Sequence, residues 1–172
     1  MLCILAKLDD ESRKKLAEIQ KTAEDFGLPV KELHGHVTLA CYIGGSEEQF
    51  IQSCREKVGS EAPFKVIYDR IDVFETSSCI VAEPRKEQKI ENVHREISCK
   101  WSDDLNSWTK DNVWLPHTTL VQFPGADPEV LNAAADAMRK NFKPFEACVT
   151  ELEFSRVLDG GRYEIADTIK LK

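Results

Sequence analysis

One pattern of residues occurs twice in this chain, and the two copies stand 81 positions apart. The first reads His36-Val37-Thr38-Leu39 and the second reads His117-Thr118-Thr119-Leu120. The chain has only four histidines, so two His-x-Thr-Leu stretches exceed what chance placement would give. Both stretches stand among β-prone residues, which predicts a strand at each. A fold for this chain therefore has to accommodate two equivalent strands.

The offset of 81 residues recurs beyond the two motifs. The helix-start signal Ser46-Glu47-Glu48 corresponds to Asp127-Pro128-Glu129. Further matches in the same register are Pro63-Phe64 with Pro144-Phe145, Ile71 with Leu152, Val73 with Phe154, and Tyr42 with Phe123. Because the register runs without gaps, we interpret the chain as an internal duplication with units of about 1–76 and 77–154. Two copies are too few for a solenoid.

Hydrophobic periodicity divides each unit into alternating strands and helices. The predicted strands are 2–8, 36–43, 64–75, 78–83, 117–123 and 145–154, and the predicted helices are 10–26, 46–58, 86–100 and 127–141. A C-terminal hairpin within 153–171 is expected to turn at Asp159-Gly160-Gly161, and 101–116 reads as a loop. This order predicts one α+β domain over 1–172, with two pseudo-symmetric lobes around a central cleft. Each lobe would be an antiparallel sheet with helices outside.

Composition and charge narrow the function classes. A hydrophobic fraction of 42% and a charged fraction of 31% are ordinary for a globular protein. The net charge of −7 argues against broad binding of duplex DNA, although it allows a local basic pocket. The apolar start is too short for a signal peptide or a membrane span, so we expect a cytoplasmic monomer without membrane association. Six cysteines without a C-x-x-C pair predict free, mostly buried thiols.

The two motifs carry the residues needed for acid–base chemistry on a phosphate. Side chains at i and i+2 of a strand share a face, so His36 lies beside Thr38 and His117 beside Thr119. Pseudo-two-fold symmetry would turn both faces toward one cleft. One imidazole could then activate water while the other protonates the departing oxygen, and the hydroxyls could bind phosphate oxygens. Such a site requires no metal, and neither motif supplies a metal-ligand set.

Four further aromatic residues are secondary candidates for the site. The motif faces are expected to continue to Tyr42 and Phe123, which could stack on a base or pack into the lobe cores. His34 could line the cleft or lie on the surface. His94 stands in a helical stretch without a motif, so we expect a structural role for it.

The loop 101–116 and the last hairpin leave two alternatives open. Trp101, Trp108 and Trp114 are equally consistent with a lid over a nucleotide and with anchors of a loop. Arg156 and Arg162 could neighbour a phosphate, whereas solvated surface charge is the default for arginine.

On these motifs the chain resembles the 2H phosphoesterase superfamily, which includes 2'-5' RNA ligase-like proteins and cyclic nucleotide phosphodiesterases. The resemblance extends from the opening LCILAKL to the closing SRVLDGGRYEIADTIKL. It implies that His36 and His117 are the catalytic acid–base pair, that Thr38 and Thr119 bind phosphate, and that no metal or cofactor takes part. RNA ligase-like members often carry a basic residue after the second motif, where this chain has Gln122 and Phe123. This departure favours a small cyclic phosphate.

The sequence therefore predicts a metal-independent phosphoesterase with a small phosphorylated nucleotide or an RNA end as its partner. It would hydrolyse a cyclic phosphate of the 2',3'-cyclic nucleotide or RNA-end type, or carry out reversible 2'-5' phosphodiester chemistry. The alternative is a non-catalytic nucleotide- or RNA-binding module on the same fold. Which histidine is the acid and which the base stays open at this level.

Overall fold

The computed structural model describes residues 1–85, 89–159 and 162–172. Its strands are β1 (Leu2–Leu8), β2 (His36–Tyr42), β3 (Phe64–Phe74), β4 (Cys79–Pro84), β5 (Thr118–Gln122), β6 (Phe145–Val157) and β7 (Tyr163–Lys170). Its helices are α1 (Asp10–Gln20), α2 (Glu47–Val58), α3 (Lys89–Ser98) and α4 (Pro128–Asn141). The predicted residues 86–88 of the third helix, and Gly160-Gly161 of the hairpin turn, lie outside the described residues.

The strands form one antiparallel sheet in the order β2-β1-β6-β3-β4-β5, with β7 paired to β6. The long strand β6 joins the two halves, because it pairs with β3 through its first residues and with β1 and β7 through its later ones. The predicted α+β class with antiparallel pairing is confirmed. The strands of the two lobes belong to a single continuous sheet.

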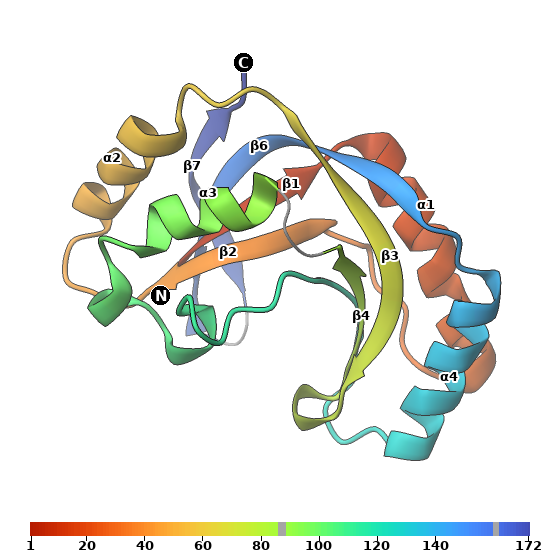
Figure 1. Cartoon of the computed structure of the whole chain (residues 1–172). Coiled ribbons are helices and arrows are strands. Elements are labelled where there is room, and N and C mark those ends of the chain that lie inside the picture. Colours follow the sequence, from red (N-terminus) through yellow and green to blue (C-terminus); the bar gives the residue numbers. More distant parts are fainter. Residues whose placement is uncertain (86–88, 160–161) are drawn as a thin grey trace.

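The helices form two groups, one on each half of the sheet. Helix α1 packs near α4 and the strands β5 and β6, while α2 and α3 pack together and α3 contacts β2. Figure 1 shows α1 and α4 on one side of the curved sheet and α2 and α3 on the other. The order β-α-β-α-β thus occurs twice along the chain, from β1 to β3 and from β4 to β6.

The elements keep the offset of 81 residues seen in the sequence. Helix α2 begins at Glu47 and α4 at Pro128, and β3 begins at Phe64 and β6 at Phe145. Ser46 and Asp127 are both N-caps whose side chains accept a hydrogen bond from the first turn. An origin by duplication remains our interpretation of this common register.

Both motif strands carry a β-bulge at the equivalent position. On β1, Ile4 pairs with Ala40 and the next residue, Leu5, pairs with Thr38, which leaves Leu39 as an extra residue in β2. On β4, Ile80 pairs with Val121 and Val81 pairs with Thr119, which leaves Leu120 extra in β5. Each bulge reverses the alternation of faces along its strand.

The predicted continuation of the first motif face from Thr38 to Tyr42 is therefore wrong. Beyond the bulge, Ala40 and Tyr42 lie opposite Ile4 and Leu2, on the core face. Tyr42 is only 3% exposed and its ring stacks on Phe50 at a centroid distance of 4.6 Å. The same reversal directs Val121 into the core, while Phe123 follows the end of β5 and is 42% exposed.

Helix side chains satisfy the carbonyl groups of the two bulged leucines. Gln20 of α1 donates from Nε2 to the Leu120 carbonyl at 2.7 Å. His94 of α3 donates from Nδ1 to the Leu39 carbonyl at 2.7 Å, and its ring stacks on Trp114 at 3.9 Å. A buried carbonyl without a partner is costly, so each helix stabilises the bulge beneath it. His94 has the structural role expected from the sequence.

The segment 101–116 covers the free edge of β2. The Trp114 indole donates from Nε1 to the Thr38 carbonyl at 2.8 Å, and the backbone N–H of Asn106 donates to the Cys41 carbonyl at 2.8 Å. Trp101 packs edge-on against the rings of Tyr42 and Phe50. An uncovered edge strand invites pairing with other chains, and this segment prevents it. Trp101 and Trp114 thus anchor the loop, whereas Trp108 is exposed.

Two sequence expectations about chain detail are corrected. Cys3 and Cys41 were expected to be free but form a disulfide, because the β1–β2 register places them directly opposite each other with Cα atoms 4.1 Å apart. The predicted helix 10–26 is α-helical only to Gln20 and continues as a 3₁₀ helix over Lys21–Phe26. It ends at Gly27, whose φ of 70° suits glycine.

In the part of the chain that the structure describes, no helix is both long enough and apolar enough to cross a membrane.

Replacing Gln20 by Ala tests the support of the second bulge. We expect the Gln20→Ala variant to lose roughly 1–3 kcal/mol of unfolding free energy, because the Leu120 carbonyl would be left buried without a donor. Urea unfolding measures this loss. The matched control is Gln49→Ala, an exposed glutamine on α2. Equal losses in the two variants would contradict the proposed role of Gln20.

Candidate functional site

The two motif strands, β2 and β5, are the opposite edges of the sheet, and the curvature of the sheet brings them together. The Thr118 hydroxyl donates to the His36 carbonyl at 2.9 Å. The buried Tyr68 hydroxyl lies 2.6 Å from the same Thr118 oxygen and can donate to it. Thr118 therefore joins the two motifs, since it stands directly between His117 and Thr119.

His36 and Thr38 lie on the same face of β2, as the motif predicts. His36 pairs with Lys7 and Thr38 with Leu5, and both motif side chains are half-buried. Thr119 pairs with Val81 and is also half-buried. It contributes to a cavity of about 190 Å³ that lies between the two halves of the chain and is also lined by His34 and Gln122.

The two motif imidazoles have different surroundings. His117 places Nδ1 2.7 Å from the Leu115 carbonyl, so that Nδ1 carries the hydrogen and Nε2 is left for a ligand. Its ring meets Phe74 edge-on at 4.9 Å. His36 has a buried Nδ1 with no hydrogen-bond partner among the described residues. The ring nitrogen of His36 that can reach a ligand is therefore also Nε2.

Electrostatics keep His36 neutral. Burial lowers the pKa of His36 from 6.5 to about 3, and His34, Lys7 and His117 add to the lowering while Glu153 opposes it. The influence of His117 reflects how near the two motif imidazoles lie. Burial also lowers the pKa of His117, but the Leu115 carbonyl and the Glu83 carboxylate counteract that effect.

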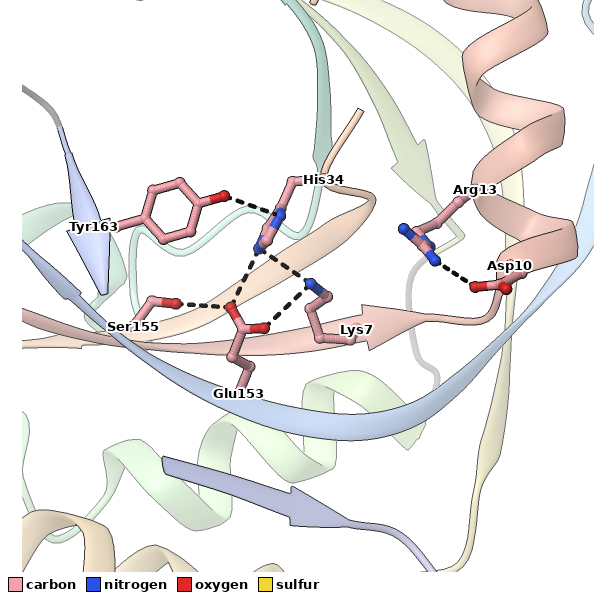
Figure 2. Close-up of polar contacts among 7 residues, drawn as sticks. All are labelled: Lys7, Asp10, Arg13, His34, Glu153, Ser155 and Tyr163. Carbon is pink, nitrogen blue, oxygen red and sulfur yellow. Dashed lines mark hydrogen bonds and ion pairs between the residues drawn. The ribbon is translucent and has the colours of Figure 1, made fainter. Parts of the chain in front are cut away.

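A polar cluster that sequence reasoning largely missed adjoins His36. It consists of Lys7, His34, Glu153, Ser155 and Tyr163, and Figure 2 shows it on β1, the loop before β2, β6 and β7. Lys7 Nζ lies 3.2 Å from Glu153 Oε2 and 3.1 Å from His34 Nε2. Glu153 Oε1 lies 3.2 Å from His34 Nε2 and accepts from Ser155 at 2.7 Å.

The cluster is buried and internally paired. The side chains of Lys7 and Glu153 are 12% and 4% exposed. Burial by itself would raise the pKa of Glu153, but Ser155, His34 and Lys7 outweigh it and lower that pKa. The ring of His34 meets that of His36 edge-on at 5.1 Å and that of Tyr163 at 5.3 Å. His34 thus connects the cluster to the first motif.

The available sequence signal for this cluster was weak. Lys7 and Glu153 are charged residues inside otherwise apolar strand segments, which marks them as unusual. They are 146 residues apart, however, and only the β1–β6 pairing brings them together. Of the two arginines considered as phosphate neighbours, Arg156 is paired with Glu47 and Glu164. Arg162 is exposed.

Within the described residues, no group of three or more His, Cys, Asp or Glu side chains is arranged to hold a metal ion.

Titration of His36 predicts a specific acid sensitivity of the fold. Because the pKa of His36 is lowered to about 3 in the folded state, the unfolded chain binds more protons between pH 6.5 and 3, and stability falls with pH in that window. At pH 5 this costs roughly 2 kcal/mol relative to pH 7. The His36→Asn variant should lose less stability by about that amount in urea unfolding at both pH values. An identical loss in the variant and the wild type would contradict the assignment.

Comparison with known proteins identifies the family. A model of the 2'-5' RNA ligase superfamily matches residues 8–161. Among solved structures, the chain is similar to TT0787 of Thermus thermophilus, with a TM-score of 0.70, 18% identity and coverage of 99% of this chain and 97% of that one. No curated protein sequence matches it.

Two further structures share the fold over nearly their whole length. E. coli LigT in its apo form gives a TM-score of 0.64 at 16% identity, with coverage of 99% of this chain and 96% of LigT. Kluyveromyces marxianus Usb1 gives 0.52 at 12% identity, with coverage of 99% and 96%. With the family match over most of its length and both motifs side by side, the chain belongs to the 2'-5' RNA ligase superfamily of 2H phosphoesterases.

Proposed function

We propose that this protein is a metal-independent phosphoesterase that opens a cyclic phosphate on a nucleotide or an RNA end. The observation that carries the proposal is the contact between the two motif strands, where Thr118 bonds the His36 carbonyl. This contact holds two imidazoles and two threonine hydroxyls near one place. The reverse reaction, which would join ends through a 2'-5' linkage, uses the same groups.

The chemistry needs both histidines and no further acid or base. A water oxygen attacks phosphorus while one imidazole takes the proton of the water. The P–O bond of the ring breaks, and the second imidazole, as imidazolium, gives its proton to the departing ribose oxygen. Thr38 and Thr119 donate hydrogen bonds to the non-bridging oxygens, whose negative charge grows in the transition state.

Three observations support a small phosphorylated nucleotide as the substrate class. Crystal structures of E. coli LigT hold 3'-AMP, NADP+, phosphate and ATP. The net charge of −7 disfavours long polyanions. The register of β5 places the neutral Gln122 opposite Cys79, so this position near the second motif offers a phosphate an amide rather than a cation. We therefore favour a nucleoside 2',3'-cyclic phosphate over a long RNA.

Replacing either motif histidine by Ala should abolish turnover. We expect His36→Ala and His117→Ala each to lower kcat/KM for nucleoside 2',3'-cyclic phosphates by roughly 10²–10⁴-fold, because each removes one proton transfer. The assay is a screen of cyclic phosphates and 2'-5'-linked oligonucleotides in the presence of EDTA. Full activity of both variants would refute the proposal. Tight binding of a cyclic nucleotide by the wild type without any turnover would instead favour the non-catalytic binding module.

Replacing the motif threonines by Val tests their contact with phosphate. Thr38→Val and Thr119→Val keep the side-chain shape and remove one donor, so we expect kcat to fall by about 10²-fold in each. The matched control is Thr76→Val, at an exposed threonine in the turn between β3 and β4. If all three variants retained wild-type kcat, the hydroxyls would have no part in catalysis.

A further inference from the structure

The neighbours of the two motif histidines differ in charge at equivalent positions of the two halves. On β1, Lys7 is the residue opposite His36, two positions beyond the Leu5–Thr38 pair. On β4, Val81 is opposite Thr119, and continuing that register by two residues places Glu83 beside His117. The first histidine thus has a cation beside it, and the second has an anion.

Each of these charged side chains is held in place by a partner of opposite charge. Glu153 binds Lys7 from β6, and both side chains are largely buried. Arg70 of β3 binds Glu83, and the Glu83 side chain is 6% exposed whereas that of Arg70 is 52% exposed. Because water screens the exposed guanidinium more strongly, the buried carboxylate keeps more of its influence on His117.

Hydrogen bonding separates the two imidazoles in the same direction. An imidazolium carries hydrogen on both nitrogens, and the Leu115 carbonyl accepts one of these hydrogens from His117. Nδ1 of His36 has no acceptor among the described residues, so its imidazolium would keep a buried N–H without a partner. The neutral ring needs only one hydrogen and suffers less from this lack.

We propose that Lys7 and Glu83 are positioning residues that polarise the histidine pair, so that His36 is the general base and His117 the general acid. The assignment rests on the proposed function for its chemistry. The neutral Nε2 of His36 takes the proton of the attacking water, and the imidazolium of His117 donates its proton to the leaving ribose oxygen. Proton exchange with solvent then returns both rings to their starting states.

The charged groups around each ring agree with this assignment. His36 faces Lys7 from β1, Glu153 from β6, His34 from its own segment and His117 from the start of β5; all except Glu153 disfavour its protonation. His117 faces Glu83, which favours its protonation. The lowered pKa of His117 leaves a minor imidazolium fraction at neutral pH, so the assignment places optimum turnover on the acid side of neutrality.

An NMR titration of the imidazole signals of the free, full-length protein tests the polarisation without any substrate. We expect His117 to titrate at least about one pH unit above His36. Lys7→Met should raise the pKa of His36 and leave His117 unchanged, and Glu83→Gln should lower the pKa of His117 and leave His36 unchanged. Lys7→Arg keeps the cation and should restore the wild-type titration of His36.

The opposite order of the two titrations in the wild type would overturn the proposal, even if a variant failed to fold. Equal shifts of both histidines in each variant would overturn it as well, because they would indicate a general structural change. The wild-type measurement is independent of turnover. If the protein opened no cyclic phosphate but showed the expected titrations, the proposed function would fail while the polarisation stood.

A kinetic experiment then assigns the roles. In a nucleoside cyclic phosphate whose leaving ring oxygen is replaced by sulfur, the departing thiolate needs no proton. We expect His117→Ala to recover at least about 10-fold of its lost activity on this substrate, relative to the oxygen compound, and His36→Ala to recover none. Recovery by His36→Ala and not by His117→Ala would reverse the assignment.

Discussion

The two β-bulges at Leu39 and Leu120 determine how the rest of the molecule can be arranged. An extra residue in each motif strand lets the histidine and threonine face the site, while the residues just beyond it face the core. Without the bulges, strict alternation would keep Tyr42 on the side of His36 and remove its ring from the core. The bulges persist because His94 and Gln20 bond the carbonyls of the two extra leucines.

The site exists because the two edge strands of one curved sheet meet. An edge strand presents unpaired backbone groups, and here these groups are used to bind the other motif and the segment 101–116. The carbonyls of His36 and Thr38 accept from Thr118 and Trp114, so the backbone of the first motif is bonded on both sides. This gives the catalytic candidates a rigid support, which acid–base chemistry at fixed distances requires.

Similar motifs in two halves do not produce two similar imidazoles. The backbone of the two halves follows one register, but the side chains opposite the histidines are Lys7 and Glu83. A symmetric pair of histidines could not divide the roles of acid and base, because equal pKa values favour equal protonation. The asymmetry resides in residues outside the motifs, in the buried cluster around Lys7 and in the pair of Glu83 with Arg70.

Much of the architecture could be predicted from local pattern. Strand and helix order follows from hydrophobic periodicity, and the offset of 81 residues located the starts of α4 and β6 from those of α2 and β3. The pairing of His36 with Thr38 on one face followed from strand period alone. These features depend on residues close together in the chain, whose geometry the backbone itself dictates.

The sequence by itself determined the fold class, the two motifs and the chemistry that they can carry. Only the tertiary structure decided that Tyr42 packs in the core, that Cys3 and Cys41 are joined, and that Lys7, His34 and Glu153 adjoin His36. The physical reason is the same in each case. A single extra residue reverses the face of a strand, and contacts between residues 38 to 146 positions apart depend on strand register, which local pattern does not encode.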